Sequence, residues 1–118
     1  MTKLELGKLG EKIAQTYLAN IGHKIIKTNY RSGRLEIDII SKYKNLIVFT
    51  EVKTRIKTAE SIQENPLGLP QATNIKKAIS SYIFKNKLNL DLTRLDLIIV
   101  LVNITGSQTD IVHYQDIF

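Results

Sequence analysis

Acidic residues and a lysine occupy alternate positions in two neighbouring, strongly apolar segments of this chain. Glu36 and Asp38 stand in the first segment, and Glu51 and Lys53 stand in the second. Side chains along a β-strand point alternately to opposite faces, so the members of each pair share a face. A hairpin that matched these faces would bring Asp38 close to Glu51, and Glu36 close to Glu51 or Lys53. The spacing therefore predicts three carboxylates and one ammonium group in a single cluster.

Such a cluster is costly without a ligand, because each buried charge loses its hydration and neighbouring carboxylates repel one another. Bound Mg²⁺ or Mn²⁺ would compensate the repulsion, since these cations prefer carboxylate oxygens. A metal of this kind lowers the pKa of bound water and stabilises charge on a phosphate under attack. Lys53 could position or activate that water. The alternative from the residues alone is a solvated strand face, on which Glu and Lys side chains pair across the hairpin.

Hydrophobic patterning predicts the elements that must position this cluster. Apolar residues at helical spacing predict a helix over residues 5–20, in which Gly7 and Gly10 would allow a close approach to a sheet. A second helix is predicted to begin near Pro70. β-Branched runs predict strands over residues 24–28, 35–41, 46–54, 94–102 and 110–114.

The remaining segments are predicted to be loops, and the whole chain is predicted to be one domain. Residues 29–34 form a basic, turn-rich segment, and residues 55–70 show no clear period. The resulting order, α-β-β-β-α-β-β, is typical of an α/β domain with a central mixed β-sheet flanked by helices. We expect this single domain to span residues 1–118.

The composition indicates a basic protein in a reducing compartment. The 118 residues include 17 Lys or Arg and 11 Asp or Glu, which gives a net charge of +6. A basic excess favours polyanionic partners, because binding a phosphate backbone releases its counterions. The chain has no cysteine, which excludes disulfides and thiolate zinc sites. It also lacks an apolar run long enough for a signal peptide or a membrane helix, so we expect a cytoplasmic protein without membrane contact.

An ordered set of motifs resembles a known family. Asp38, twelve residues and then Glu51-Val52-Lys53 is similar to the PD-(D/E)XK signature of restriction-endonuclease-like nucleases. Further matching segments follow one another along the chain: Gly7-Lys8-Leu9-Gly10-Glu11, Asn29-Tyr30-Arg31, Glu36-Ile37-Asp38, Phe49–Arg55, Thr73, Lys76 and Arg94-Leu95-Asp96. Over residues 5–102 the chain resembles the YraN-like family of small bacterial proteins, which is placed in one superfamily with the archaeal Holliday-junction resolvases.

The resemblance implies a restriction-endonuclease-like fold and assigns roles to residues. Asp38 and Glu51 would be catalytic metal ligands, Lys53 the catalytic lysine, and Glu11 a third metal ligand from the first helix. From the residues alone, Glu11 could instead complement the helix dipole. Glu36 is predicted to support the metal set. The chain departs from the family at Leu35, where Gly is usual, at Thr50, and over residues 56–69.

Other side chains are candidates for contacts with nucleic acid or with the site. Gln71, at the start of the second helix, could face the site, and helix capping or packing is the alternative. Phosphate contact or base stacking is predicted for Tyr30, Arg31, Arg34, Arg55 and Lys76, with solvated surface charges as the alternative. Arg94 and Asp96 are interpreted as a structural pair, and His23 and His113 as structural or exposed.

The function predicted from these patterns is metal-dependent hydrolysis of phosphodiester bonds in DNA. Branched or otherwise structured DNA, in repair or recombination, is the favoured substrate, because so small a domain has little surface for reading sequence. A homodimer would supply two sites for two strands. The alternatives are a nucleic-acid-binding module with little activity of its own, and a structural protein whose acidic residues pair with lysines.

Overall fold

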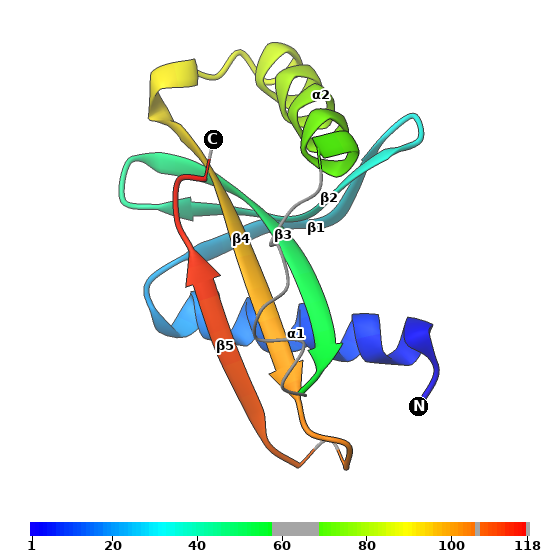
Figure 1. The fold of residues 1–118 in the computed structure, drawn as a ribbon. Helices are drawn as coiled ribbons and strands as arrows, with labels where there is room; N and C mark the ends of the chain where they lie inside the picture. The colour runs from blue at the N-terminus through cyan, green and yellow to red at the C-terminus, as the bar shows by residue number, and fades with distance from the viewer. Residues whose placement is uncertain (58–68, 106, 118) are drawn as a thin grey trace.

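The computed structural model describes residues 1–57, 69–105 and 107–117, without the side chains of residues 69–73. The elements are, in chain order, α1 (Lys3–Asn20), β1 (Lys24–Ser32), β2 (Leu35–Tyr43), β3 (Leu46–Ile56), α2 (Leu69–Lys85), a 3₁₀ turn η2 (Leu90–Leu92), β4 (Thr93–Val102) and β5 (Thr109–Tyr114). The predicted order of helices and strands is confirmed. Figure 1 shows the strands as one sheet with the two helices packed against it.

The five strands form a mixed sheet in the order β1-β2-β3-β4-β5. Neighbouring strands are antiparallel except for β3 and β4, which run parallel from the Ile47–Thr93 pair to the Ile56–Val102 pair. A parallel connection needs a crossover, and α2 supplies it between these two strands. The structure is therefore the α/β arrangement that the sequence predicts, with a central mixed sheet and flanking helices.

The two helices cover opposite faces of the sheet. Ala14 and Leu18 of α1 pack in one core cluster with four strand residues: Ile39, Ile98, Val100 and Val102. Ile75, Ala78 and Tyr82 of α2 pack in another with a different strand set: Ile37, Ile40, Phe49 and Leu95. Leu95 and Ile98 lie an odd number of residues apart in β4, so their side chains point to different faces.

Helix α1 starts where the sequence provides a cap and approaches the sheet where it provides a glycine. The Glu5 amide donates to Thr2 Oγ1 at 3.1 Å, and the Thr2 amide donates to Glu5 Oε1 at 3.3 Å. This reciprocal pair is a capping box. Further along, a Cβ added to Gly10 would lie 1.7 Å from Thr54 Oγ1, whereas one added to Gly7 would meet nothing within 4 Å. The predicted close approach of helix and sheet therefore occurs at Gly10.

Strand β1 is longer than the sequence predicts, and this corrects the loop predicted over residues 29–34. Tyr30 pairs with Ile37 and Arg31 with Glu36, so only Gly33 and Arg34 remain as a turn between β1 and β2. The polar, basic residues are tolerated because this part of β1 is an exposed edge, paired only with β2. Strand β3 likewise extends to Ile56, because the parallel partner β4 continues its hydrogen bonding. The rest of the predicted 55–70 loop, residues 58–68, lies outside the described residues.

Candidate metal centre

Strand β2 separates from β3 at a fork, and Asp38 lies in it. The last β2–β3 pair on this side is Ile39 with Thr50; beyond it, β2 continues to pair with β1. The Val52 amide does not continue the ladder but donates to Asp38 Oδ2 at 2.8 Å. The Asp38 carboxylate therefore ends the β2–β3 pairing and is held between the two strands.

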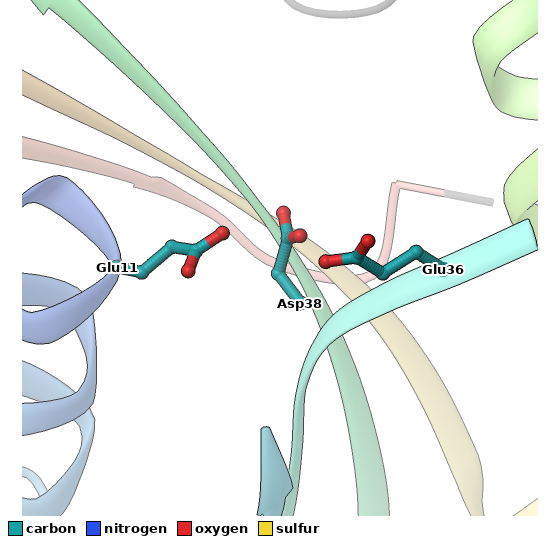
Figure 2. Close-up of side chains that lie close together, drawn as sticks. All are labelled: Glu11, Glu36 and Asp38. Carbon is teal, nitrogen blue, oxygen red and sulfur yellow. The ribbon is translucent and has the colours of Figure 1, made fainter. Parts of the chain in front are cut away.

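Glu11 reaches the same fork from helix α1, which packs on one face of the sheet. The contact between Gly10 and Thr54 brings this turn of α1 against β3. Glu11 follows directly and is partly buried. Figure 2 shows its side chain extending from α1 towards Asp38, with Glu36 approaching Asp38 from the opposite side.

Glu11, Glu36 and Asp38 form what we call the carboxylate trio. One carboxylate oxygen from each of the three lies within 4.8 Å of those from the other two, which makes them the group with metal-ligand spacing in the described part of the chain. Two members come from β2 and one from α1, and Figure 2 shows the three carboxylates converging. Segments far apart in the sequence therefore contribute to one small acidic volume.

The surroundings of the carboxylate trio disfavour the ionised forms of Asp38 and Glu11. Burial raises the pKa of Asp38, and the charge of Glu36 adds to this, whereas hydrogen bonds from the Val52 amide and with Glu51 oppose it. Burial also raises the pKa of Glu11, followed by the charges of Asp38 and Glu36. Both carboxylates are thus harder to ionise than free acids, because removal from water and mutual repulsion disfavour their charged forms.

The donor set fits a hard divalent cation. Mg²⁺ and Mn²⁺ take carboxylate oxygens in preference to nitrogen or sulfur, and all three donors of the trio are carboxylates. A divalent charge would also reverse the effect that raises the two pKa values, since an opposite charge favours ionised acids. Glu11, Glu36 and Asp38 are therefore the residues that could hold such an ion, and Glu51 is close enough to Asp38 to lower the pKa of that carboxyl.

Glu51 and Lys53 lie on β3 beside a cleft that leads to Glu11. The cleft has a volume of about 810 Å³ and runs between the first turns of α1 and the end of β3. Thr2, Leu6 and Glu11 line it on the helix side, and Glu51, Lys53 and Arg55 line it on the strand side. Acidic and basic side chains thus face one solvent-accessible space, which is what an anionic substrate bound beside a cation requires.

Glu36 joins the cluster by a different route from the one that the hairpin pattern suggests. The pattern brings Glu36 near Glu51 or Lys53 across β2 and β3, but the fork interrupts that ladder after Ile39. Glu36 instead pairs with Arg31 of β1, and the Arg31 Nη2 atom lies 3.3 Å from Glu36 Oε2. Its carboxylate turns towards Asp38 from this position (Figure 2).

Asn29 also contacts the carboxylate trio; it belongs to the Asn29-Tyr30-Arg31 segment that matches the family but was not predicted to be a site residue. Its backbone has a φ of 50°, in the left-handed region. With its side-chain NH₂ facing the acids, Asn29 donates to Glu36 Oε1 at 3.0 Å and to Glu11 Oε2 at 3.1 Å. The available signal was its residue type: asparagine tolerates left-handed geometry better than other side chains.

The residues predicted to contact nucleic acid are spread over three regions. Arg31 and Arg34 are exposed at the end of the β1–β2 hairpin, and Arg55 lines the cleft, where it donates to the Thr54 carbonyl at 2.9 Å. Tyr30 is partly buried, and its ring packs edge-on against Tyr82. Lys76 is exposed on α2, beside a separate groove of about 250 Å³. The side chain of Gln71 lies outside the described residues.

A second polar network lies in the interior, around Asp96. Arg94 donates to both Asp96 oxygens at 2.8 Å, as its interpretation as a structural pair implies. His113 Nε2 lies 2.8 Å from Asp96 Oδ2, and His113 Nδ1 lies 2.9 Å from the Tyr17 hydroxyl of α1. His23 is buried against Ser41, at 2.8 Å. Both histidines are structural, and this network ties β4 and β5 to α1.

Together, the fold and the site define a small α/β domain whose mixed sheet carries an acidic cluster at a strand fork. The chain belongs to the family described as "Uncharacterised protein family UPF0102", whose model matches residues 10–100. A UPF0102 protein of Christiangramia forsetii is 35% identical over 97% of this chain and 93% of its own length. One of Chlorobium phaeobacteroides is 37% identical over 96% and 92%. The resemblance to the YraN-like family is confirmed, and the matched range contains the carboxylate trio, Glu51 and Lys53.

None of the helices in the described ranges is long and apolar enough to cross a membrane.

Proposed function

We propose that this domain is a metal-dependent endodeoxyribonuclease that hydrolyses phosphodiester bonds, with branched or structured DNA as its substrate. The observation that carries the proposal is the convergence of Glu11, Glu36 and Asp38 within 4.8 Å beside a cleft that also holds Glu51 and Lys53. Glu11 and Asp38, whose pKa values are raised, suit a divalent cation better than a purely structural role, because no cationic partner offsets Asp38 in the described ion pairs.

The roles of the residues follow from their chemistry. Asp38 and Glu51 are the catalytic carboxylates and, with Glu11, metal ligands; Glu36, which belongs to the same carboxylate trio, is an auxiliary ligand from β2. Bound Mg²⁺ or Mn²⁺ supplies an activated water and stabilises negative charge on the phosphate. Lys53 lines the same cleft. Its ammonium group orients the attacking water by hydrogen bonding and offsets charge on the phosphate oxygens.

The surface charge supports a nucleic acid as the polyanion. The net charge is +6 although the site itself is acidic, so the basic side chains dominate elsewhere. Several of them are exposed on the β1–β2 hairpin, next to the strand that bears Glu36 and Asp38: Lys24, Lys27, Arg31 and Arg34. Contacts of this type go to phosphates and position a duplex without reading its sequence. The same hairpin also favours the second candidate, a nucleic-acid-binding module with little activity of its own.

The test is cleavage of labelled single-stranded, duplex, flap and four-way-junction DNA, and of RNA, with Mg²⁺, with Mn²⁺ or with EDTA. We expect metal-dependent cutting of structured DNA that Asp38→Asn abolishes and that Lys53→Ala lowers by about 10²–10⁴-fold. Asp110→Asn and Lys85→Ala, which change one exposed charge outside the site, are matched controls and retain activity. Cleavage that survives EDTA, or persists in Asp38→Asn, overturns the proposal. Tight binding of junctions without cutting under any metal identifies the binding module instead.

A further inference from the structure

We propose that Asn29 is a positioning residue that holds Glu11 and Glu36 ready for the cation; this inference rests on the proposed metal site. Its two amide hydrogens reach two carboxylates on different elements, Glu11 of α1 and Glu36 of β2, at 3.1 and 3.0 Å. In the absence of a cation, these neutral donors partly offset the repulsion between the acids. Asn29 of β1 therefore connects α1 and β2 at the proposed metal site.

The geometry leaves the acids free to bind metal at the same time. Asn29 binds one oxygen of each carboxylate, Oε2 of Glu11 and Oε1 of Glu36. A carboxylate offers about four lone-pair sites. Glu11 therefore keeps its other oxygen for a cation, and Glu36 keeps lone pairs on Oε2 beside Arg31. Partners of this kind orient metal ligands and commonly change metal affinity by about 10–100-fold when they are removed.

The backbone of Asn29 explains why an asparagine does this. Asn29 lies in β1 between the Thr28–Ile39 and Tyr30–Ile37 pairs, and therefore across from Asp38. Its φ of 50° departs from the extended values of a strand. Asparagine combines tolerance of left-handed geometry with two side-chain donors, whereas glycine offers only the geometry and aspartate has no donors when ionised.

The experiment compares Asn29→Gly with wild type, because glycine keeps the left-handed backbone without strain and removes only the amide. Lys87→Gly is the matched control, since Lys87 has a φ of 52° in another part of the chain. We measure Mn²⁺ affinity by calorimetry and the side-chain NMR chemical shifts of Glu11 and Glu36 in metal-free protein. We expect Mn²⁺ binding about 10-fold weaker in Asn29→Gly and unchanged in Lys87→Gly.

The NMR measurement reports the contact independently of metal. The Asn29 amide lies 3.1 Å from Glu11 Oε2 and 3.0 Å from Glu36 Oε1, so its removal should change the side-chain chemical shifts of both acids. Wild-type Mn²⁺ affinity in Asn29→Gly, or unchanged side-chain chemical shifts of Glu11 and Glu36, overturns the role of Asn29 while leaving the metal site intact. Failure of the wild type to bind Mn²⁺ or Mg²⁺ overturns the metal site itself, and the positioning role with it.

Discussion

The Asp38 carboxylate accepts a hydrogen bond from the Val52 amide at 2.8 Å, in place of a backbone partner, where β2 and β3 part. This contact gives Asp38 a structural role in addition to the proposed metal ligation. Because the β2–β3 pairing stops at this point, the Asp38 carboxylate of β2 can also lie close to the Glu11 carboxylate of α1.

The two roles of Asp38 can be separated by comparing two substitutions. Asp38→Asn retains an oxygen that can accept from Val52, so we expect a fold close to wild-type stability and loss of Mn²⁺ binding and cleavage. Asp38→Ala leaves the partly buried amide without its partner, at a cost of about 1–3 kcal/mol in unfolding free energy. Urea denaturation and calorimetry measure the two effects. Equal stability of the Asn and Ala variants would contradict the structural role.

Lys53 is expected to act on the reaction rather than on the metal. Because its ammonium group lines the cleft but is no metal ligand, Lys53→Ala should leave Mn²⁺ affinity unchanged. Cleavage should fall by about 10²–10⁴-fold, the range for a lost group that assists proton transfer. Single-turnover cleavage alongside calorimetry checks this prediction. A variant that loses metal affinity in proportion to activity would assign Lys53 to the structure of the site instead.

The pH dependence of metal-free stability tests the repulsion within the carboxylate trio. The pKa values of Glu11 and Asp38 lie above their ordinary values of 4.5 and 3.8, so the folded state binds more protons than the unfolded chain just above those values. Stability should therefore fall as the pH rises through this window. Glu11→Gln removes one of the repelling charges and should flatten that fall.

Denaturation in EDTA between pH 4 and pH 8 measures this effect, with Asp110→Asn as the control outside the trio. Added Mn²⁺ should favour wild type instead. It should stabilise wild type by about 2.7 kcal/mol when its concentration is a hundred times the Kd, and Glu11→Gln by less. Identical pH profiles for wild type and Glu11→Gln would contradict the raised pKa of Glu11, which burial and the charges of Asp38 and Glu36 together produce.

Local pattern predicts much of this molecule, and long-range geometry accounts for the rest. The alternation around Asp38 and Glu51 predicts both strands, and the apolar period predicts the helix that bears Glu11. The fork itself cannot be read from alternation, because it depends on where β2 loses its pairing with β3 while it keeps its pairing with β1. Asn29 was missed for the same reason: its role requires the left-handed backbone at a point fixed by strand pairing.

The Asp96 network should dominate stability without entering the chemistry. Asp96 is fully buried, and although burial raises its pKa, hydrogen bonds from His113, Arg94 and the Asp116 amide lower it overall. Asp96→Asn leaves the largely buried Arg94 without its counter-charge, so we expect a loss of about 3–5 kcal/mol at pH 7.

The acid dependence of the same variant supplies its control. A carboxyl with a lowered folded pKa contributes stability that is present above its ordinary value of 3.8 and lost as the pH falls through the folded value. The difference between wild type and Asp96→Asn should therefore shrink below about pH 4. Urea denaturation from pH 3 to 7 measures it, with the exposed Asp91→Asn for comparison. A difference that is constant with pH would contradict an ionised Asp96.

Gly10 and Gly7 form a matched pair for testing how α1 positions Glu11. A methyl group at Gly10 would lie 1.7 Å from Thr54 Oγ1, so Gly10→Ala must push the helix away from β3. We expect a loss of about 1–3 kcal/mol from overpacking, and weaker Mn²⁺ binding because Glu11 moves with the helix. Gly7→Ala meets nothing within 4 Å and should instead stabilise the helix, by up to about 1 kcal/mol.

The double variant Gly10→Ala with Thr54→Ala removes two Thr54 atoms that the new methyl group would strike, Oγ1 at 1.7 Å and Cγ2 at 2.7 Å, and leaves Thr54 Cβ at 2.7 Å to be accommodated. The double variant should therefore be more stable than the sum of the two single-variant stability changes predicts, by a coupling of about 0.5–3 kcal/mol in a double-mutant cycle. Recovery of Mn²⁺ affinity in the same protein would tie the position of the helix to the site, because neither residue is a metal ligand. Additive effects on stability would contradict the close approach. Additive effects on Mn²⁺ affinity would mean that Glu11 is held by Asn29 and its neighbours in the trio rather than by the packing of α1.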